Sequence, residues 1–152
     1  MNNDSKLACD PQKNIQDRPK NARLADFLFE AGMLRFTPRT GYQFLGTGSE
    51  NVAEHSFRTA MVGFVLARMA NIAPEHVVMI CLFHDFHEAR IGDFNYVNRI
   101  YNTTAPRAAM EHALQGTGLD DDVLPLWDEL EAADTLEARL AHDADQIDFI
   151  LN

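Results

Sequence analysis

The sequence predicts an all-α domain, a bundle of about six helices with no significant sheet. Two observations predict it: apolar residues recur at helical spacing in segment after segment, and no segment offers a second strand with which a sheet could form. At 152 residues, of which 46% are hydrophobic and 24% charged, the chain is long enough for one buried core. We expect a mobile polar tail over residues 1–20 and one domain over residues 21–152.

The first helix is expected over residues 23–34, where Leu24, Phe27, Leu28 and Ala31 recur at helical spacing. Residues 35–49 contain a proline and three glycines, so they predict a loop. This loop is long for a compact domain, and long ordered loops often carry function.

The second helix is expected from Asn51, which fits an N-cap because Glu54 follows three residues later, to about Ala70. Between Phe57 and Met69 this segment is apolar on nearly every face. We therefore expect it to be central and buried.

The third helix is expected to open at Pro74, a residue suited to the first turn, and to end at Gly92. Residues 77–83 could instead form a buried strand, because several of them are β-branched. The helical pattern on both sides favours the helix.

The remaining chain predicts a loop over residues 93–104, a helix from Pro106 to about Gly116 and a less regular helix over residues 120–133. A last helix is expected to follow an Asp134–Glu137 capping box and to run through Leu151. It is still apolar where the sequence stops at residue 152. Either this helix completes the core, or further protein or a second subunit covers it.

The net charge of −10 and the pI near 4.9 argue against a nucleic-acid-binding face, which needs clustered basic residues. A small anionic substrate would need a local metal ion or arginine. The two cysteines, Cys9 and Cys81, make no disulfide framework, so free thiols in a reducing compartment are expected. No signal peptide and no apolar stretch of about 20 residues is evident. These features predict a cytoplasmic protein without membrane contact.

The His84-Asp85 pair follows an apolar run over residues 77–83, where an imidazole and a carboxylate are costly to bury unpaired. A divalent cation would satisfy both groups, since imidazole nitrogen and carboxylate oxygen are good metal ligands. His55 alone would more often be a hydrogen-bonded core residue, but beside His84-Asp85 it predicts a second imidazole ligand. His87 is not expected to be a ligand, because side chains two apart on a helix do not face each other.

A further carboxylate could come from the last helix, which offers Asp143, Asp145 and Asp148. Helical periodicity favours Asp143, which shares a face with Leu140 and Ile147, and it places Asp145 on the opposite face. A helix that crosses a core can have two buried faces, so the pattern leaves both residues open.

Four segments of the chain, in their order along the sequence, resemble the HD-domain phosphohydrolases. Among these enzymes the resemblance is closer to the branch of bacterial 5′-deoxynucleotidases and eukaryotic HD-domain-containing proteins. Residues 84–93 match the His-Asp-x-x-Glu-x-x-x-Gly-Asp pattern of that branch at every fixed position. The other three similar segments are residues 38–42, residues 51–56 and residues 144–145.

This resemblance implies that His55, His84, Asp85 and, in preference to Asp143, Asp145 bind the metal. It implies Co²⁺ or Mn²⁺ first, and a mixed nitrogen and oxygen ligand set also admits Fe²⁺, Zn²⁺ and Ni²⁺. A homodimer is a further implication of the resemblance.

The same resemblance makes Glu88 the proton-transfer residue and gives Asp93 a place near the sugar or in support of the site. Without the resemblance, Glu88 is interpreted as a carboxylate that supports the metal ligands or lies on the surface, and Asp93 as a turn residue. Arg39 would clamp the phosphate as part of the catalytic and substrate-binding set. Tyr42 would stack on a base where relatives have Trp.

The function implied is that of a phosphomonoesterase, which releases phosphate from nucleoside 5′-monophosphates, deoxy forms first, by attack of metal-bound water. Two alternatives stay open. One is a nucleotide-binding or regulatory HD module with little turnover, and the other is a phosphatase of another small phosphorylated metabolite.

Overall fold

The computed structural model describes residues 18–152, so all but the last three residues of the predicted tail lie outside the described part. Cys9 lies there as well. Within residues 18–152 the regular structure is helical, and the strand-type pairing is limited to one isolated bridge between Pro38 and Asn51. The all-α prediction is confirmed.

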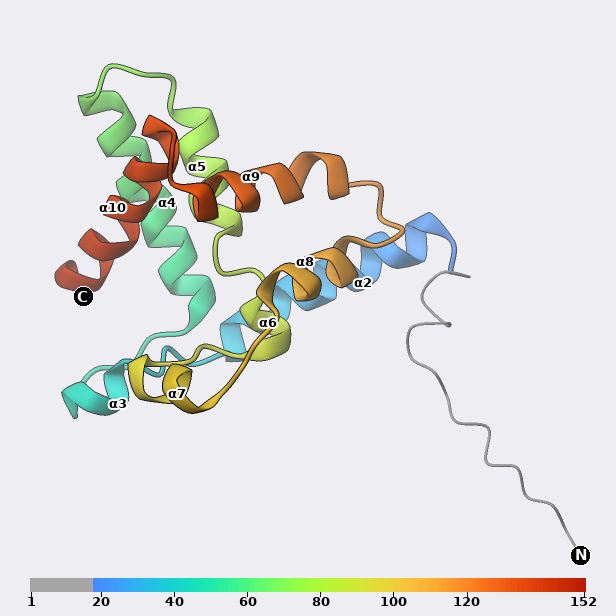
Figure 1. The fold of residues 1–152 in the computed structure, drawn as a ribbon, viewed down its shortest axis with the longest axis horizontal. Helices are drawn as coiled ribbons and strands as arrows, with labels where there is room; N and C mark the ends of the chain where they lie inside the picture. Colours follow the sequence, from blue (N-terminus) through green and yellow to red (C-terminus); the bar gives the residue numbers. More distant parts are fainter. Residues whose placement is uncertain (1–17) are drawn as a thin grey trace, which may run out of the picture.

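The six predicted helices are present, and short helices are added between them (Figure 1). In chain order the elements are α2 (Lys20–Met33), the 3₁₀ helix η1 (Leu34–Phe36), α3 (Tyr42–Leu45), α4 (Val52–Met69), α5 (Pro74–Phe83), α6 (Glu88–Ile91), α7 (Tyr96–Tyr101), α8 (Pro106–Leu114), α9 (Asp120–Ala132) and α10 (Leu136–Leu151).

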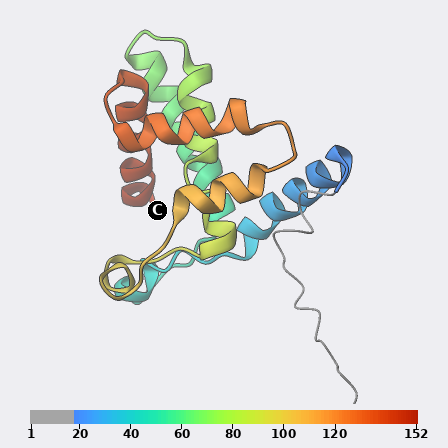
Figure 2. The same ribbon diagram turned by 45° about the vertical axis from the view of Figure 1, so that its right-hand side comes forward.

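Helices α4, α5 and α10 pack side by side, and α9 packs across α5 and α10 (Figures 1 and 2). One apolar core, which includes Ile80, Leu126 and Ala144, lies among these four helices. A second core, which includes Phe27 and Met110, lies where α2, α6 and α8 meet. Phe83 packs against both cores, so the end of α5 lies at their junction.

The capping box at the start of α4 is confirmed: the Asn51 side chain accepts from the Glu54 backbone N–H, and the Glu54 side chain accepts from the Asn51 N–H. The prediction that α4 is central and buried is correct for the side that packs on α5 and α10 and wrong for the opposite side. Its small residues face α5 and α10, whereas Phe57 is 64% exposed and Met61 is 53% exposed. Burial in this part of the chain therefore follows the small side chains, which allow close helix contact.

The third predicted helix does not run to Gly92. It ends at Phe83, and a tight turn leads to α6, which Gly92 ends with a φ of 78°. The strand alternative is also wrong. The turn carries Phe86 into the second core, where its ring stacks on Phe27 with 4.8 Å between the ring centroids. Tertiary packing thus overrides the helical periodicity.

Both predicted loops contain helix, α3 in the first and α7 in the second. The start of α7 is capped by Asn95, whose side chain accepts from the Asn98 backbone N–H at 3.0 Å. The N-cap of α10 is Thr135 rather than Asp134, because the Thr135 hydroxyl oxygen accepts from the Ala138 N–H. None of the helices in residues 18–152 has the length and apolar character needed to span a bilayer.

Candidate metal centre

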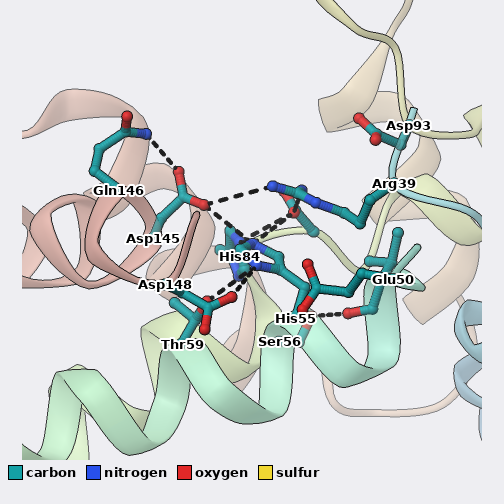
Figure 3. Close-up of polar contacts among 12 residues, drawn as sticks. Arg39, Glu50, His55, Ser56, Thr59, His84, Asp93, Asp145, Gln146 and Asp148 are labelled. Carbon is teal, nitrogen blue, oxygen red and sulfur yellow. Dashed lines mark hydrogen bonds and ion pairs between the residues drawn. The ribbon is translucent and has the colours of Figure 1, made fainter. Parts of the chain in front are cut away.

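Three helices bring the predicted ligands together (Figure 3). His55 lies in the first turn of α4 and is fully buried, and His84 and Asp85 directly follow α5. Asp145 projects from α10, and Figure 3 shows it reaching toward the imidazoles from the side opposite Arg39. Residues remote in the sequence thus meet because α4, α5 and α10 form one packed layer.

Ligand atoms of His55, His84 and Asp145 lie within 4.8 Å of one another, and an oxygen of Asp85 lies beside both imidazoles. Nε2 of His55 lies 3.1 Å from Nε2 of His84 and 3.0 Å from Oδ1 of Asp145. Oδ2 of Asp85 lies 3.0 Å from Nε2 of His84 and 3.6 Å from Nε2 of His55. Ligands about 2.1 Å from one metal ion and at right angles to each other are about 3 Å apart. The residues therefore fit a transition-metal ion.

The tautomers of the two histidines agree with this fit. Nδ1–H of His84 donates to the Cys81 carbonyl at 2.7 Å, and Nδ1–H of His55 donates to Asp148 Oδ2 at 2.9 Å. In a neutral ring that donates from Nδ1, Nε2 carries no proton. The lone pairs of the two Nε2 atoms therefore point toward each other. A proton or a cation must lie between them, since two bare lone pairs at 3.1 Å repel.

The charges around the centre determine which of its groups carry a proton when no metal is bound. Burial alone would lower the pKa of His84, but the carboxylates of Asp85 and Asp145 raise it to about 9. Burial alone would raise the pKa of Asp85, but His84 and Arg39 hold it well below its usual range. The centre thus retains a proton at neutral pH, and a bound cation would displace that proton.

Arg39 lies at the edge of this centre. Its Nη1 donates to Asp85 Oδ2 at 3.0 Å, and its Nη2 lies 3.9 Å from Asp145 Oδ1. Burial would lower the pKa of Arg39, but the surrounding carboxylates, Asp85 first, raise it. The backbone N–H of Arg39 donates to the Glu50 carbonyl, which fixes this loop beside the start of α4.

Glu88 lies in α6 with 4% of its surface exposed. Burial, followed by the charges of Asp85 and Asp93, raises its pKa to about 9. Asp93 Oδ2 accepts from the Thr40 backbone N–H at 2.6 Å, and the Thr40 hydroxyl donates to the Asp93 carbonyl. Asp93 therefore ties the end of α6 to the Arg39 loop.

Two cavities flank the centre, and Asp85 and Asp145 line both. The first, about 430 Å³, is also lined by residues that include Glu88, His87 and His142. The second, about 460 Å³, is also lined by residues that include Arg39, Tyr42, Asp93 and Phe149. The predicted substrate-binding residues thus share the second cavity.

Asp143 is exposed and lies outside the cluster, so the periodicity that favoured it was misleading. The buried face of α10 consists of Ala138, Ala141, Ala144 and Asp148. A pattern based on large apolar residues misses a face built from alanines. The resemblance, which favoured Asp145, pointed to the residue that lies beside both imidazoles.

Asp148 is the site residue whose role the sequence reasoning missed. It is fully buried behind His55, and Nε of Arg58 lies 2.9 Å from its Oδ1 as an ion pair. Its position three residues after Asp145, on the same side of the helix, was the available signal.

Several curated proteins that are similar to this chain are named 5′-deoxynucleotidases. The 5′-deoxynucleotidase HDDC2 of Xenopus laevis is 31% identical over 134 residues, which cover 84% of this chain and 66% of the relative. The human protein of that name is 28% identical, with 84% of this chain and 65% of the relative covered. This chain thus spans slightly less than two thirds of their length.

Solved structures and the family profile agree on the fold. A conserved hypothetical protein from Pyrococcus furiosus superposes with a TM-score of 0.71 at 31% identity, covering 84% of this chain and 78% of that one. A protein from Pyrococcus horikoshii gives 0.69 at 26% identity, with 84% and 75% covered. The profile of the HD domain matches residues 31–152. The chain therefore belongs to the HD-domain family.

Proposed function

We propose that this protein is a metal-dependent phosphohydrolase that releases phosphate from nucleoside 5′-monophosphates, deoxy forms first. The main support is the convergence of two imidazoles and two carboxylates beside Arg39, at a point open to two cavities. The names of the curated relatives suggest the substrate class.

In this proposal His55, His84, Asp85 and Asp145 hold the metal ion. Their two nitrogens and two oxygens suit Co²⁺, Mn²⁺, Fe²⁺, Zn²⁺ or Ni²⁺ better than Ca²⁺, and Co²⁺ or Mn²⁺ is expected first. When bound, such an ion lowers the pKa of water towards about 7 and neutralises charge on a phosphate.

Arg39 would bind the phosphate. Its Nη1 is engaged by Asp85, whereas Nη2 is 3.9 Å from Asp145 and is free to turn toward a phosphate oxygen. Asp93 holds the loop that carries Arg39, through its contacts with Thr40. Tyr42 lines the same cavity and offers a ring on which a base could stack.

Glu88 would supply the proton that the leaving sugar oxygen needs. Because burial raises its pKa to about 9, Glu88 carries a proton at neutral pH and can donate it. In the described part of the chain, its Oε2 has no hydrogen-bond partner, so that atom is available to a substrate.

The test is a screen of phosphate release from about a dozen phosphorylated metabolites. The protein is first stripped of metal and then supplied with Co²⁺ or Mn²⁺. We expect release from deoxynucleoside 5′-monophosphates, and a loss of about 10²-fold or more in kcat for Glu88→Gln. If no compound releases phosphate, the proposal fails and the binding-module alternative is favoured. The predicted homodimer and cytoplasmic location remain proposals.

A further inference from the structure

Two neighbouring side chains keep buried polar atoms without partners. Among the described residues, the buried side-chain atoms that lack a hydrogen bond are His87 Nδ1, Glu88 Oε2 and Asp148 Oδ1. Asp148 Oδ1 has its ion pair with Arg58, whereas the other two atoms have none. Such an atom costs about 1–3 kcal/mol, so a pair of them calls for a bound partner.

His87 and Glu88 form a cluster with Asp85. Each of the three offers one ligand atom, and these atoms lie within 4.8 Å of one another. The cluster exists because the chain turns between α5 and α6, whereas on a continuous helix Asp85 and His87 would point apart. The edge-to-face contact of His87 with Trp127, at 6.3 Å between ring centroids, holds the imidazole in place.

We propose that Asp85, His87 and Glu88 bind a second divalent cation, beside the centre formed by His55, His84 and Asp145. Asp85 is shared, because its contacts with His84 and Arg39 both use Oδ2 and leave its other oxygen uncommitted. Carboxylates bridge ions about 3.5–4 Å apart in two-metal sites. One imidazole and two carboxylates suit Zn²⁺, Mn²⁺ or Co²⁺.

On the basis of the proposed function, the second ion inhibits turnover. Once Glu88 is a ligand, it has no proton to give to a leaving group. Metal added beyond one ion per chain therefore lowers turnover. The His87→Asn variant, which weakens the second site and leaves Glu88 free, loses this inhibition.

The binding test uses metal-stripped protein titrated with Co²⁺, with the bound metal counted after dialysis. Trp127 is the single tryptophan of the chain and contacts His87, so Co²⁺ at the second site quenches its fluorescence. We expect two ions per chain, with quenching that follows the second. His87→Asn binds one ion without that quenching. His142→Asn, a control in the same cavity but outside the cluster, keeps both.

A wild-type protein that saturates at one ion per chain would overturn the proposal, as would two ions and unchanged quenching in His87→Asn. If circular dichroism shows that His87→Asn is unfolded, Glu88→Gln replaces it and is expected to bind one ion. Stoichiometry and quenching do not depend on turnover. An absence of phosphate release would therefore count against the proposed function without changing this result.

Discussion

The Asp148 carboxylate fixes the nitrogen that His55 presents to the proposed metal. It accepts Nδ1–H at 2.9 Å from a fully buried position, so Nε2 is left bare and aimed at Asp145 and His84. Carboxylates behind metal-bound histidines orient the ring and raise its basicity. Neither His55 nor Asp148 can reorient easily in this packed layer.

Asp148→Asn is therefore expected to weaken binding of the first metal ion by about 10- to 100-fold. Isothermal titration of the stripped protein measures the affinity, and ¹⁵N chemical shifts of the imidazoles report the His55 tautomer. Asp143→Asn on the exposed face of the same helix is the matched control. Equal affinity in Asp148→Asn and wild type would contradict this role.

Glu88 should make the stability of the metal-free protein depend on pH. Below its usual pKa the group is protonated in both states, so it contributes no difference. As the pH rises toward about 9, the unfolded chain ionises while the folded site keeps its proton, so stability falls. Glu88→Gln, which has no proton to lose, removes this slope.

We therefore expect Glu88→Gln to stabilise the stripped protein by about 1–3 kcal/mol at pH 8 and by less at pH 5. Denaturant unfolding at the two pH values measures the difference. The exposed Glu111→Gln serves as the control and should show no such pH dependence. A Glu88→Gln effect of the same size at both pH values would show that the carboxyl is ionised in the folded protein.

At the scale of elements, residues that start or end a helix predicted helix boundaries well where their effect is local. Asn51 with Glu54 and Pro106 each mark a helix start that the structure confirms. Gly92 ends the short helix α6 and not the long third helix that was predicted. Tertiary packing determined two features that the local sequence signals did not predict. Phe86 breaks the third helix by entering a distant core, and the alanine face of α10 carries no hydrophobic signature although it is the buried one.

The contact between α4 and α5 depends on Gly63. A Cβ at this position would lie 2.7 Å from Cys81 Sγ and 3.2 Å from Val77 Cγ1. Gly63→Ala should therefore destabilise the fold by about 1–3 kcal/mol. It should also weaken metal binding, since α4 carries His55 and His84 directly follows α5. Denaturant unfolding and metal titration measure both effects.

Gly32→Ala in α2 is the control for this substitution. A Cβ there meets no atom within 4 Å, so the change should be neutral or should stabilise by about 0.5–1 kcal/mol. If both alanine variants behave alike, helix propensity rather than close contact governs position 63.

At the scale of the whole molecule, the fold assembles a site from segments that the sequence motif marks only in part. The motif located His55, His84, Asp85, Glu88 and Asp145, because each keeps a fixed place in a short pattern. It gave no role to Asp148 or His87. Their contacts arise from the alanine face of α10 and from the turn after α5, which are tertiary features.

The homodimer that the resemblance implies would use the apolar face of α4, where Phe57, Met61 and Phe64 are exposed. Two chains of net charge −10 repel each other, so association should strengthen as salt screens that repulsion. Light scattering after size exclusion should give a dimer, and Met61→Glu a monomer of unchanged helix content. Leu28→Glu on α2, where the side chain is 69% exposed and lies outside the α4 face, should leave the dimer intact. A wild-type monomer across a roughly hundredfold range of concentration and at high salt would contradict the prediction.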